Sequence, residues 1–120
     1  MWPDEKDAGY LWDMLDAART ALEFAAGYDA TRYLHDRKLQ FAVERLVEII
    51  GEAARSVSSA FREAHPEIPW RRIIAQRHVL AHEYGEIRQG NMWALISEYL
   101  PELMKQLEPL LPPPPAKSEN

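Results

Sequence analysis

Hydrophobic residues recur at intervals of three and four along most of the chain, which is the spacing of one face of an α-helix. The first such segment runs from Asp7 to Ala26, and the Gly27 that follows is a typical helix end. A short segment with Thr31 and Tyr33 comes next. No window alternates strictly between apolar and polar residues, as a half-buried strand would. The pattern therefore predicts an all-α fold.

The longest periodic segment runs over residues 36–64 and ends before Pro66. As one helix it would be roughly 40 Å long at 1.5 Å per residue. Its apolar arc is wider than the about 100° that a monomeric bundle needs. Inside this arc, the small residues Gly51, Ala53 and Ala54 would let another helix approach closely. Packing within the chain would explain them, but we favour homodimerisation through these three residues.

Two further helices complete the pattern. Pro69 is favoured in a first turn and opens a third helix that ends at Gly85. Asn91 is a good N-cap for a fourth helix, which Pro101 should kink or restart. We therefore expect a four- to five-helix up-and-down bundle.

Length and composition set the domain organisation. The chain of 120 residues fits one domain, residues 1–111, followed by a proline-rich tail, residues 112–120, that we expect to be disordered. The sequence has no cysteine, which excludes disulfides and thiolate metal sites. It shows no signal peptide and no apolar run long enough to span a bilayer. We expect a cytoplasmic protein without a membrane partner.

Charge is distributed unevenly along the sequence. The formal net charge of −5 by itself disfavours a nucleic-acid partner. Residues 69–88, however, contain four arginines and two glutamates, and form the only net-positive segment. An anionic ligand is therefore expected to bind there.

This basic segment contains the stretch "RHVLAHEYG", residues 77–85. Arg77 occupies a position where the helical stripe, which continues to Tyr84, calls for an apolar residue. Buried arginine needs a partner, and Glu52 or Glu48 on the long second helix could supply the counter-charge. The alternative is a surface arginine whose aliphatic stem lies along the helix edge.

The two histidines of the stretch raise the question of a metal site. His78 and His82 are four residues apart and share a helix face, a spacing that can chelate zinc. A zinc site needs a third or fourth ligand, and His35 and His65 lie in unrelated parts of the sequence. We therefore expect neither a metal ion nor another cofactor.

Arginine and histidine together suit phosphate chemistry without a metal. Guanidinium binds phosphate oxygens bidentately, and histidine has a pKa suited to proton transfer near neutrality. In RNA the 2′-hydroxyl can act as the nucleophile. His82 follows Arg77 by five residues, about 140° around an ideal helix, so a straight helix would not place both on one face. A composite site at a dimer cleft would resolve this separation.

Three blocks of the sequence resemble the HepT-like branch of the HEPN (higher eukaryotes and prokaryotes nucleotide-binding) superfamily. They are "LWDMLDAARTALEFAAG", "LQFAVERLVEIIGEAARSVS" and "HPEIPWRRIIAQRHVLAHEYGEI". The last contains the R-x4–6-H-x-Y signature of the superfamily. The resemblance covers roughly residues 9–111.

The resemblance implies an all-helical homodimer that acts as a ribonuclease toxin and is paired with a minimal nucleotidyltransferase (MNT) antitoxin. It implies that Arg77 and His82 cleave RNA, and that the antitoxin attaches AMP to Tyr84. His78 stands where the family commonly has asparagine; it could share the acid–base role or orient the phosphate. Two alternatives stay open: a non-catalytic RNA- or partner-binding dimer that serves as the nucleotidyltransferase's target, and a helical interaction protein in which Arg77 only sets the bundle register.

Overall fold

The computed structural model describes residues 2–81 and 83–112, with the backbone alone at residues 77–81 and 86. Its described part is helical and contains no strand, which confirms the all-α prediction. The helices are α1 (Glu5–Ala25), α2 (Ala30–Leu34), α3 (Arg37–Ser56), α4 (Ser59–Ala64), α5 (Trp70–Ala81), α6 (Gly85–Ala94) and α7 (Leu100–Leu107). A π-helical turn η1 (Leu95–Tyr99) joins α6 to α7, and a 3₁₀ turn η2 (Glu108–Leu110) follows α7.

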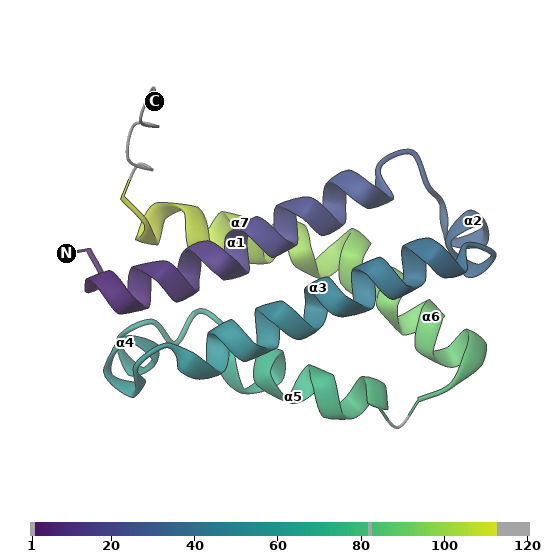
Figure 1. Cartoon of the computed structure of the whole chain (residues 1–120). Helices are drawn as coiled ribbons and strands as arrows, with labels where there is room; N and C mark the ends of the chain where they lie inside the picture. The colour runs from purple at the N-terminus through teal and green to yellow at the C-terminus, as the bar shows by residue number, and fades with distance from the viewer. Residues whose placement is uncertain (1, 82, 113–120) are drawn as a thin grey trace.

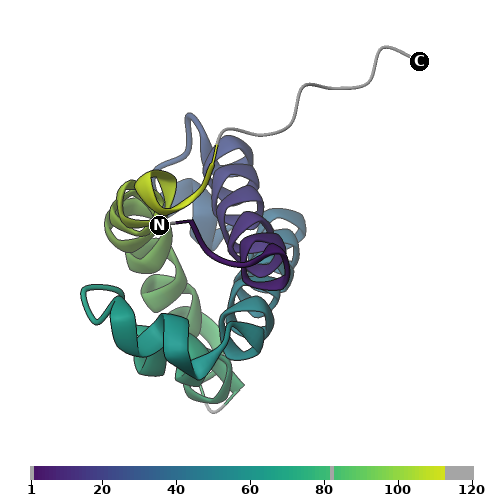
Figure 2. The ribbon, with the colours of Figure 1, turned by 90° about the vertical axis from the view of Figure 1, so that its left-hand side faces the viewer.

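The long helices α1 and α3 lie side by side, and α3 also packs on α5 (Figure 1). Helices α6 and α7 with η1 form one long rod, and α7 contacts α1. Seen end-on, α1 and α3 line one side of the bundle and the α6–α7 rod lines the other (Figure 2). The short helices α2 and α4 belong to the connections at opposite ends of α3.

The bundle interior has two hydrophobic clusters. The larger one joins α1, α3, α5 and α7 through side chains that include Leu11, Met14, Leu15, Ile50, Ile73, Leu103 and Leu107. The smaller one joins α2, α3 and α6 and includes Tyr33, Val43, Val47, Met92 and Ile96. Because α3 contributes to both clusters, its broad apolar arc is used within one chain.

All three small residues on α3 are buried by this packing, and Gly51 also closely approaches α5. Ala53 and Ala54 belong to the larger cluster, at 7% and 0% exposure. A Cβ atom added at Gly51 would lie 3.4 Å from the backbone oxygen of Ile73 on α5. These positions serve contacts inside the chain, which corrects our preference for a dimer surface here. Homodimerisation itself stays a prediction.

The predicted helix over residues 36–64 is wrong as a single helix, because α3 ends at Ser56 and α4 begins at Ser59. Ser58 caps α4 by accepting a hydrogen bond from the Phe61 amide at 3.2 Å. The buried Asp7 carboxylate of α1 accepts hydrogen bonds from the Ser58 amide at 2.8 Å and from its hydroxyl at 2.6 Å. These hydrogen bonds attach the segment between α3 and α4 to α1.

The third and fourth helices also begin and end differently from the prediction. Helix α5 ends at Ala81, and Gly85 with φ +62° begins α6 rather than ending the helix before it. Asn91 lies inside α6 and is not an N-cap. Pro101 occupies the first turn of α7, directly after the π-turn, as a restarted helix requires. Gly27, with φ +81°, follows α1 as expected.

Candidate functional site

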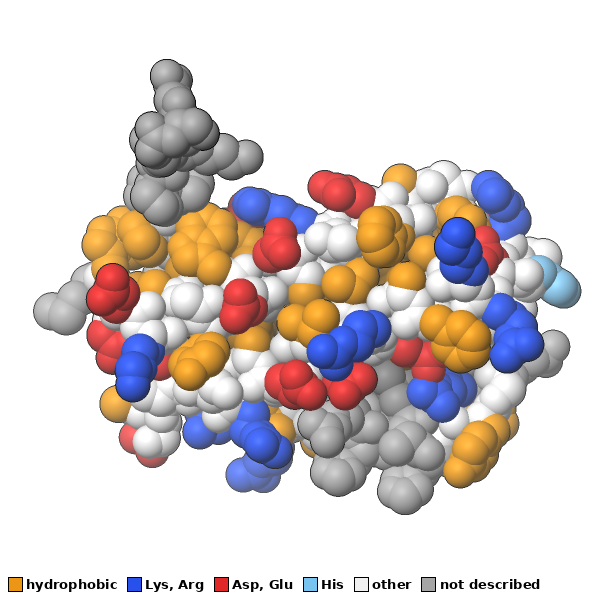
Figure 3. Space-filling view, viewed as in Figure 1, with side chains coloured by type: hydrophobic (Ala, Val, Ile, Leu, Met, Phe, Trp, Pro, Cys, Tyr) orange, Lys and Arg blue, Asp and Glu red, His pale blue; other side chains and the backbone are white. Residues whose placement is uncertain are grey.

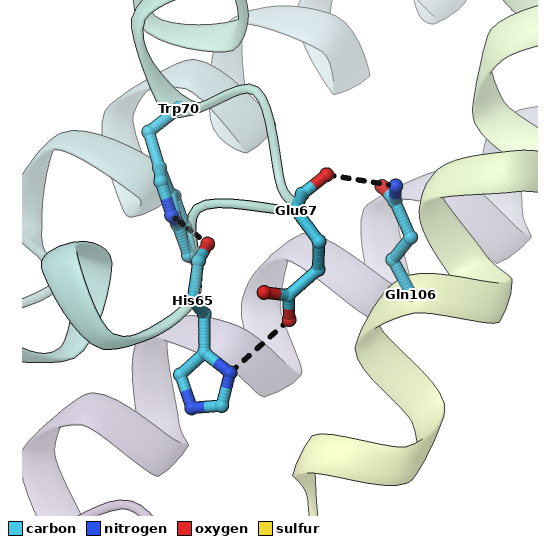
Figure 4. A network of polar contacts seen from close by, with 4 residues as sticks. All are labelled: His65, Glu67, Trp70 and Gln106. Atoms are coloured by element: carbon cyan, nitrogen blue, oxygen red, sulfur yellow. Dashed lines mark hydrogen bonds and ion pairs between the residues drawn. The ribbon is translucent and has the colours of Figure 1, made fainter.

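A network of polar contacts fixes the start of α5, the helix that contains Arg77. The indole Nε1 of Trp70 donates to the backbone oxygen of His65 at 2.9 Å, and His65 Nδ1 lies 3.1 Å from a carboxylate oxygen of Glu67 (Figure 4). The amide of Gln106 on α7 donates to the Glu67 backbone oxygen at 3.0 Å. The loop before α5 is thereby attached both to α5 and to α7.

Side-chain burial fixes which face of α5 points inward. Trp70 and Ile73 are 7% and 5% exposed, and Ile74 is half-buried. Arg77 and His78 belong to the last two turns of this helix, and their side chains lie outside the described residues, as does His82 altogether. Their mutual geometry, and that of Arg77 to a counter-charge, therefore stays a prediction.

The two glutamates considered as partners of Arg77 have distinct positions on α3. Glu48 forms an ion pair with Arg45 at 3.4 Å on the protein surface. Glu52 is exposed and borders the groove between α3 and α5. Of the two, Glu52 is thus the one that lies against the helix of Arg77.

Tyr84 is exposed, contrary to its predicted place on the inward stripe. Its side chain is 77% accessible, because α5 has ended at Ala81 and the helical register no longer applies. All five tyrosines of the chain are described, and Tyr84 is the one that is exposed to solvent. The hydroxyl of Tyr28 is hydrogen-bonded to Asp36, and those of Tyr33 and Tyr99 are buried. Tyr84 therefore presents the most accessible phenol.

An ion pair that the sequence did not suggest anchors the start of α6. The Arg88 guanidinium pairs with one carboxylate oxygen of Glu44 on α3, and Gln89 donates to the other at 3.4 Å. Asn91 also donates to the Glu83 carboxylate at 2.9 Å. The one sequence signal was that Arg88 belongs to the net-positive segment; its partner lies 44 residues away and leaves no local pattern.

The described residues offer neither a metal site nor a membrane span. Among the described side chains, those of residues 2–76, 83–85 and 87–112, no three histidine or acidic groups gather in a way that could hold a metal ion. His35 instead lies 2.8 Å from the Thr31 backbone oxygen. Within the described part, no helix has the length and hydropathy to cross a membrane.

Comparison with known proteins gives a consistent result. A family model described as "Ribonuclease HepT-like" matches residues 14–110. The "Probable ribonuclease HepT" of Thermococcus cleftensis is 38% identical over 101 residues, covering 84% of this chain and 92% of that protein. A candidate RNase of Methanocaldococcus jannaschii is 33% identical over 99 residues, 82% of this chain and 91% of its own length. A third relative, from Caldanaerobacter subterraneus, is 34% identical over 102 residues, which cover 85% of this chain and 91% of that protein. No solved structure matches.

Proposed function

Because this chain belongs to the HepT-like ribonuclease family, we propose that it is a metal-independent endoribonuclease with Arg77 and His82 as its catalytic residues. The observation that carries the proposal is the family match across residues 14–110, which spans the whole "RHVLAHEYG" stretch. The described structure supports it by ending α5 within that stretch, at Ala81, and exposing Tyr84 three residues later in the same stretch.

The proposed chemistry uses the RNA itself as the source of the nucleophile. A 2′-oxygen attacks the adjacent phosphorus, the 5′-oxygen of the next nucleotide leaves, and a 2′,3′-cyclic phosphate and a 5′-hydroxyl result. His82 accepts the proton of the attacking 2′-hydroxyl and donates a proton to the departing 5′-oxygen, since imidazole titrates near neutral pH. Arg77 stabilises the charge that builds up on the phosphorane-like transition state. His78 shares the proton transfer or orients the phosphate.

The test is cleavage of a single-stranded RNA in the presence of EDTA. Replacing Arg77 or His82 by alanine should lower the rate by at least about 100-fold. Arg45→Ala and His35→Ala are matched controls, since both residues are exposed and lie away from α5, on α3 and directly after α2. DNA of the same sequence should stay intact because it lacks the 2′-hydroxyl. Activity that vanishes in EDTA and returns with a divalent metal would refute the mechanism.

We further propose that Tyr84 is the modification site of an MNT-type nucleotidyltransferase antitoxin. The phenol oxygen attacks the α-phosphate of ATP, pyrophosphate leaves, and the phenolic proton is lost. Its exposure supports this role, since the side chain is 77% accessible. AMP on Tyr84 would add bulk and negative charge beside the basic segment and so repel RNA.

Intact mass after co-expression with an MNT-type nucleotidyltransferase tests this step. The protein should gain the mass of adenylyl groups and lose RNA cleavage, and Tyr84→Phe should gain none. Tyr10→Phe is the control, because Tyr10 is less exposed and lies on α1. An unmodified wild-type protein under these conditions would exclude Tyr84 as the acceptor.

We propose that the chain forms a homodimer in which each catalytic site combines Arg77 of one subunit with His82 of the other. Arg77 and His82 are five positions apart and α5 ends at Ala81, so one straight helix does not bring them together. Mixing Arg77→Ala with His82→Ala tests this. If each site combines both subunits, the mixed dimers should restore about a quarter of wild-type activity, since half of the dimers are mixed and each has one intact site. Sites confined to one subunit would restore none.

A non-catalytic RNA- or partner-binding dimer is the second candidate function. The net charge of −5 favours its partner-binding form, because an acidic protein repels RNA outside a local basic surface. Tight RNA binding without any cleavage product would select this function over the first.

A further inference from the structure

A groove of about 620 Å³ lies between α3, α4 and α5, on the α4 side of the motif. Gly51 of α3 and Trp70 and Ile74 of α5 contribute its apolar lining. Arg55, Arg62 and Arg71 line it as well, one from each of the three helices. The groove therefore combines an apolar lining with three guanidinium groups.

Two carboxylates, Glu52 and Glu63, line the groove beside the three arginines, so its charged side chains leave a net charge of +1. No salt bridge joins Arg55, Arg62 or Arg71 to an acidic side chain in the described part of the chain. The Nε of Arg62 is buried and has no hydrogen-bond partner among the described atoms. By contrast, Arg19, Arg45 and Arg88 each pair with a glutamate. The groove therefore has a small excess of positive charge, and its three arginines are not held in salt bridges within the described part of the chain.

The groove is continuous with the helix of the motif. Arg71, Ile74 and Ala75 line it from α5, and position 78 follows positions 74 and 75 by one helical turn. Seven residues of α-helix separate positions 71 and 78, about 10 Å along the axis. In the space-filling view, basic side chains gather at the lower edge of the molecule in the region of α5 (Figure 3).

We propose that this groove binds the RNA strand beside the scissile phosphate, with Arg55, Arg62 and Arg71 contacting its phosphates. This rests on the proposed ribonuclease function and adds the substrate-binding residues to it. Guanidinium groups bind phosphate oxygens bidentately, and an apolar lining accepts the faces of unstacked bases. A duplex has no unstacked bases to offer, so the groove selects a single strand.

Binding of an RNA oligonucleotide with 2′-O-methyl ribose throughout tests the groove without cleavage. In fluorescence anisotropy, Arg55→Gln, Arg62→Gln and Arg71→Gln combined should weaken binding by at least about tenfold. The slope of log affinity against log salt should fall in magnitude by about 2, since each phosphate contact on a single strand contributes about 0.7. The matched control combines Arg37→Gln, Lys38→Gln and Lys105→Gln, which removes the same charge elsewhere and should change affinity by less than about twofold. Circular dichroism confirms that both variants fold.

Equal losses in the two triple variants would overturn the proposal. Binding of free AMP or of an acidic peptide that depends on these arginines, without RNA binding, would overturn it too. Parallel assays on unmodified RNA separate the groove from the chemistry. If the wild type binds RNA through the groove but never cleaves it, the groove stands and the ribonuclease function fails. If the wild type cleaves RNA and the groove variant binds RNA with the same affinity as the wild type, the groove proposal alone fails. Where both hold, the groove variant should raise KM and leave kcat unchanged.

Discussion

The two ends of the bundle are held together by different kinds of contact. At the α4 end, Asp7 and Trp70 are 5% and 7% exposed and hydrogen-bond directly to the chain at Ser58 and His65. At the α6 end, Tyr84 is 77% and Ile87 71% exposed. The attachment there combines a partly exposed ion pair to α3 with the smaller hydrophobic cluster. The α4 end is therefore held by buried polar contacts, and the α6 end presents accessible side chains beside its buried cluster.

This difference separates folding from function along a short stretch of chain. Trp70 belongs to the larger hydrophobic cluster, whereas Tyr84, fourteen residues later, is almost as exposed as a free side chain. Substitutions at the α4 end should thus lower the free energy of unfolding. Those at the α6 end should change local mobility or modification with less effect on overall stability.

The largest effect on stability is expected from Asp7→Ala. It leaves the Ser58 amide and hydroxyl without their acceptor in a part-buried position, and hydrogen bonds to a charged group are each worth about 1.5–3 kcal/mol. The free energy of unfolding should fall by about 3 kcal/mol in urea denaturation. Asp13→Ala, an exposed change on the same helix, should cost less than about 0.5 kcal/mol. Equal losses of unfolding free energy in the two variants would show that the Asp7 hydrogen bonds do not stabilise the α4 end.

Glu44→Gln should have a smaller effect that is confined to the α6 end. The Glu44 and Arg88 side chains are 15% and 31% exposed, so solvent screens the pair only in part, and the expected loss is about 1 kcal/mol. Amide hydrogen exchange should accelerate in α6 and not in α1. Glu48→Gln removes the partner of Arg45 in a more exposed pair and should leave α6 unchanged. Uniform acceleration across all helices would contradict a local anchor.

These contacts also mark where prediction from sequence succeeds. Apolar periodicity correctly indicates helices throughout, because each amphipathic face is buried by a neighbouring helix. The Gly27 stop and the restart at Pro101 follow from backbone chemistry alone: one residue tolerates a positive φ, and the other lacks an amide hydrogen.

Prediction fails where the deciding partner is distant in sequence. The break between α3 and α4 depends on Asp7, 51 residues before Ser58, and the apolar period continues across the break. The ion pair of Arg88 with Glu44 cannot be predicted for the same reason, because the two residues are far apart in the sequence. Tyr84 was placed on the inward stripe because the helical period was extended beyond Ala81, where α5 ends. Side-chain directions over residues 77–85 depend on tertiary contacts that the helical period does not encode.

Alkaline pH should weaken the α6 end through Tyr33, which belongs to the smaller cluster. Burial, and then the Glu44 carboxylate, raise the pKa of the Tyr33 phenol well above its usual value of 10.0, against the opposing charge of Arg88. A raised pKa in the folded state means that stability is complete below about pH 10 and is lost as the pH rises towards the folded pKa. At one pH unit above 10, this amounts to about 1.4 kcal/mol.

Urea denaturation of Tyr33→Phe at pH 8 and about pH 11 measures this effect, the pH range being set by the usual tyrosine pKa. The variant should lose less stability between the two conditions than the wild type. At neutral pH it should be as stable or slightly more so, because the Tyr33 hydroxyl is buried without a hydrogen-bond partner among the described residues. Parallel pH curves for the two proteins would exclude this tyrosine as the cause. Burial likewise raises the pKa of Tyr99, so a smaller alkaline loss should persist in the variant.

The smallest effect on stability is expected from Tyr84→Phe, and this sharpens the comparison most. An exposed hydroxyl without a cap hydrogen bond contributes little, so the unfolding free energy should change by less than about 0.5 kcal/mol. RNA cleavage should persist, because in the proposed chemistry the phenol is an acceptor of AMP and not a proton carrier. Thermal melting and cleavage assays on the unmodified variant check both expectations. Loss of cleavage at unchanged stability would give Tyr84 a part in the reaction itself, and loss of stability would show that the α6 end depends on it for folding.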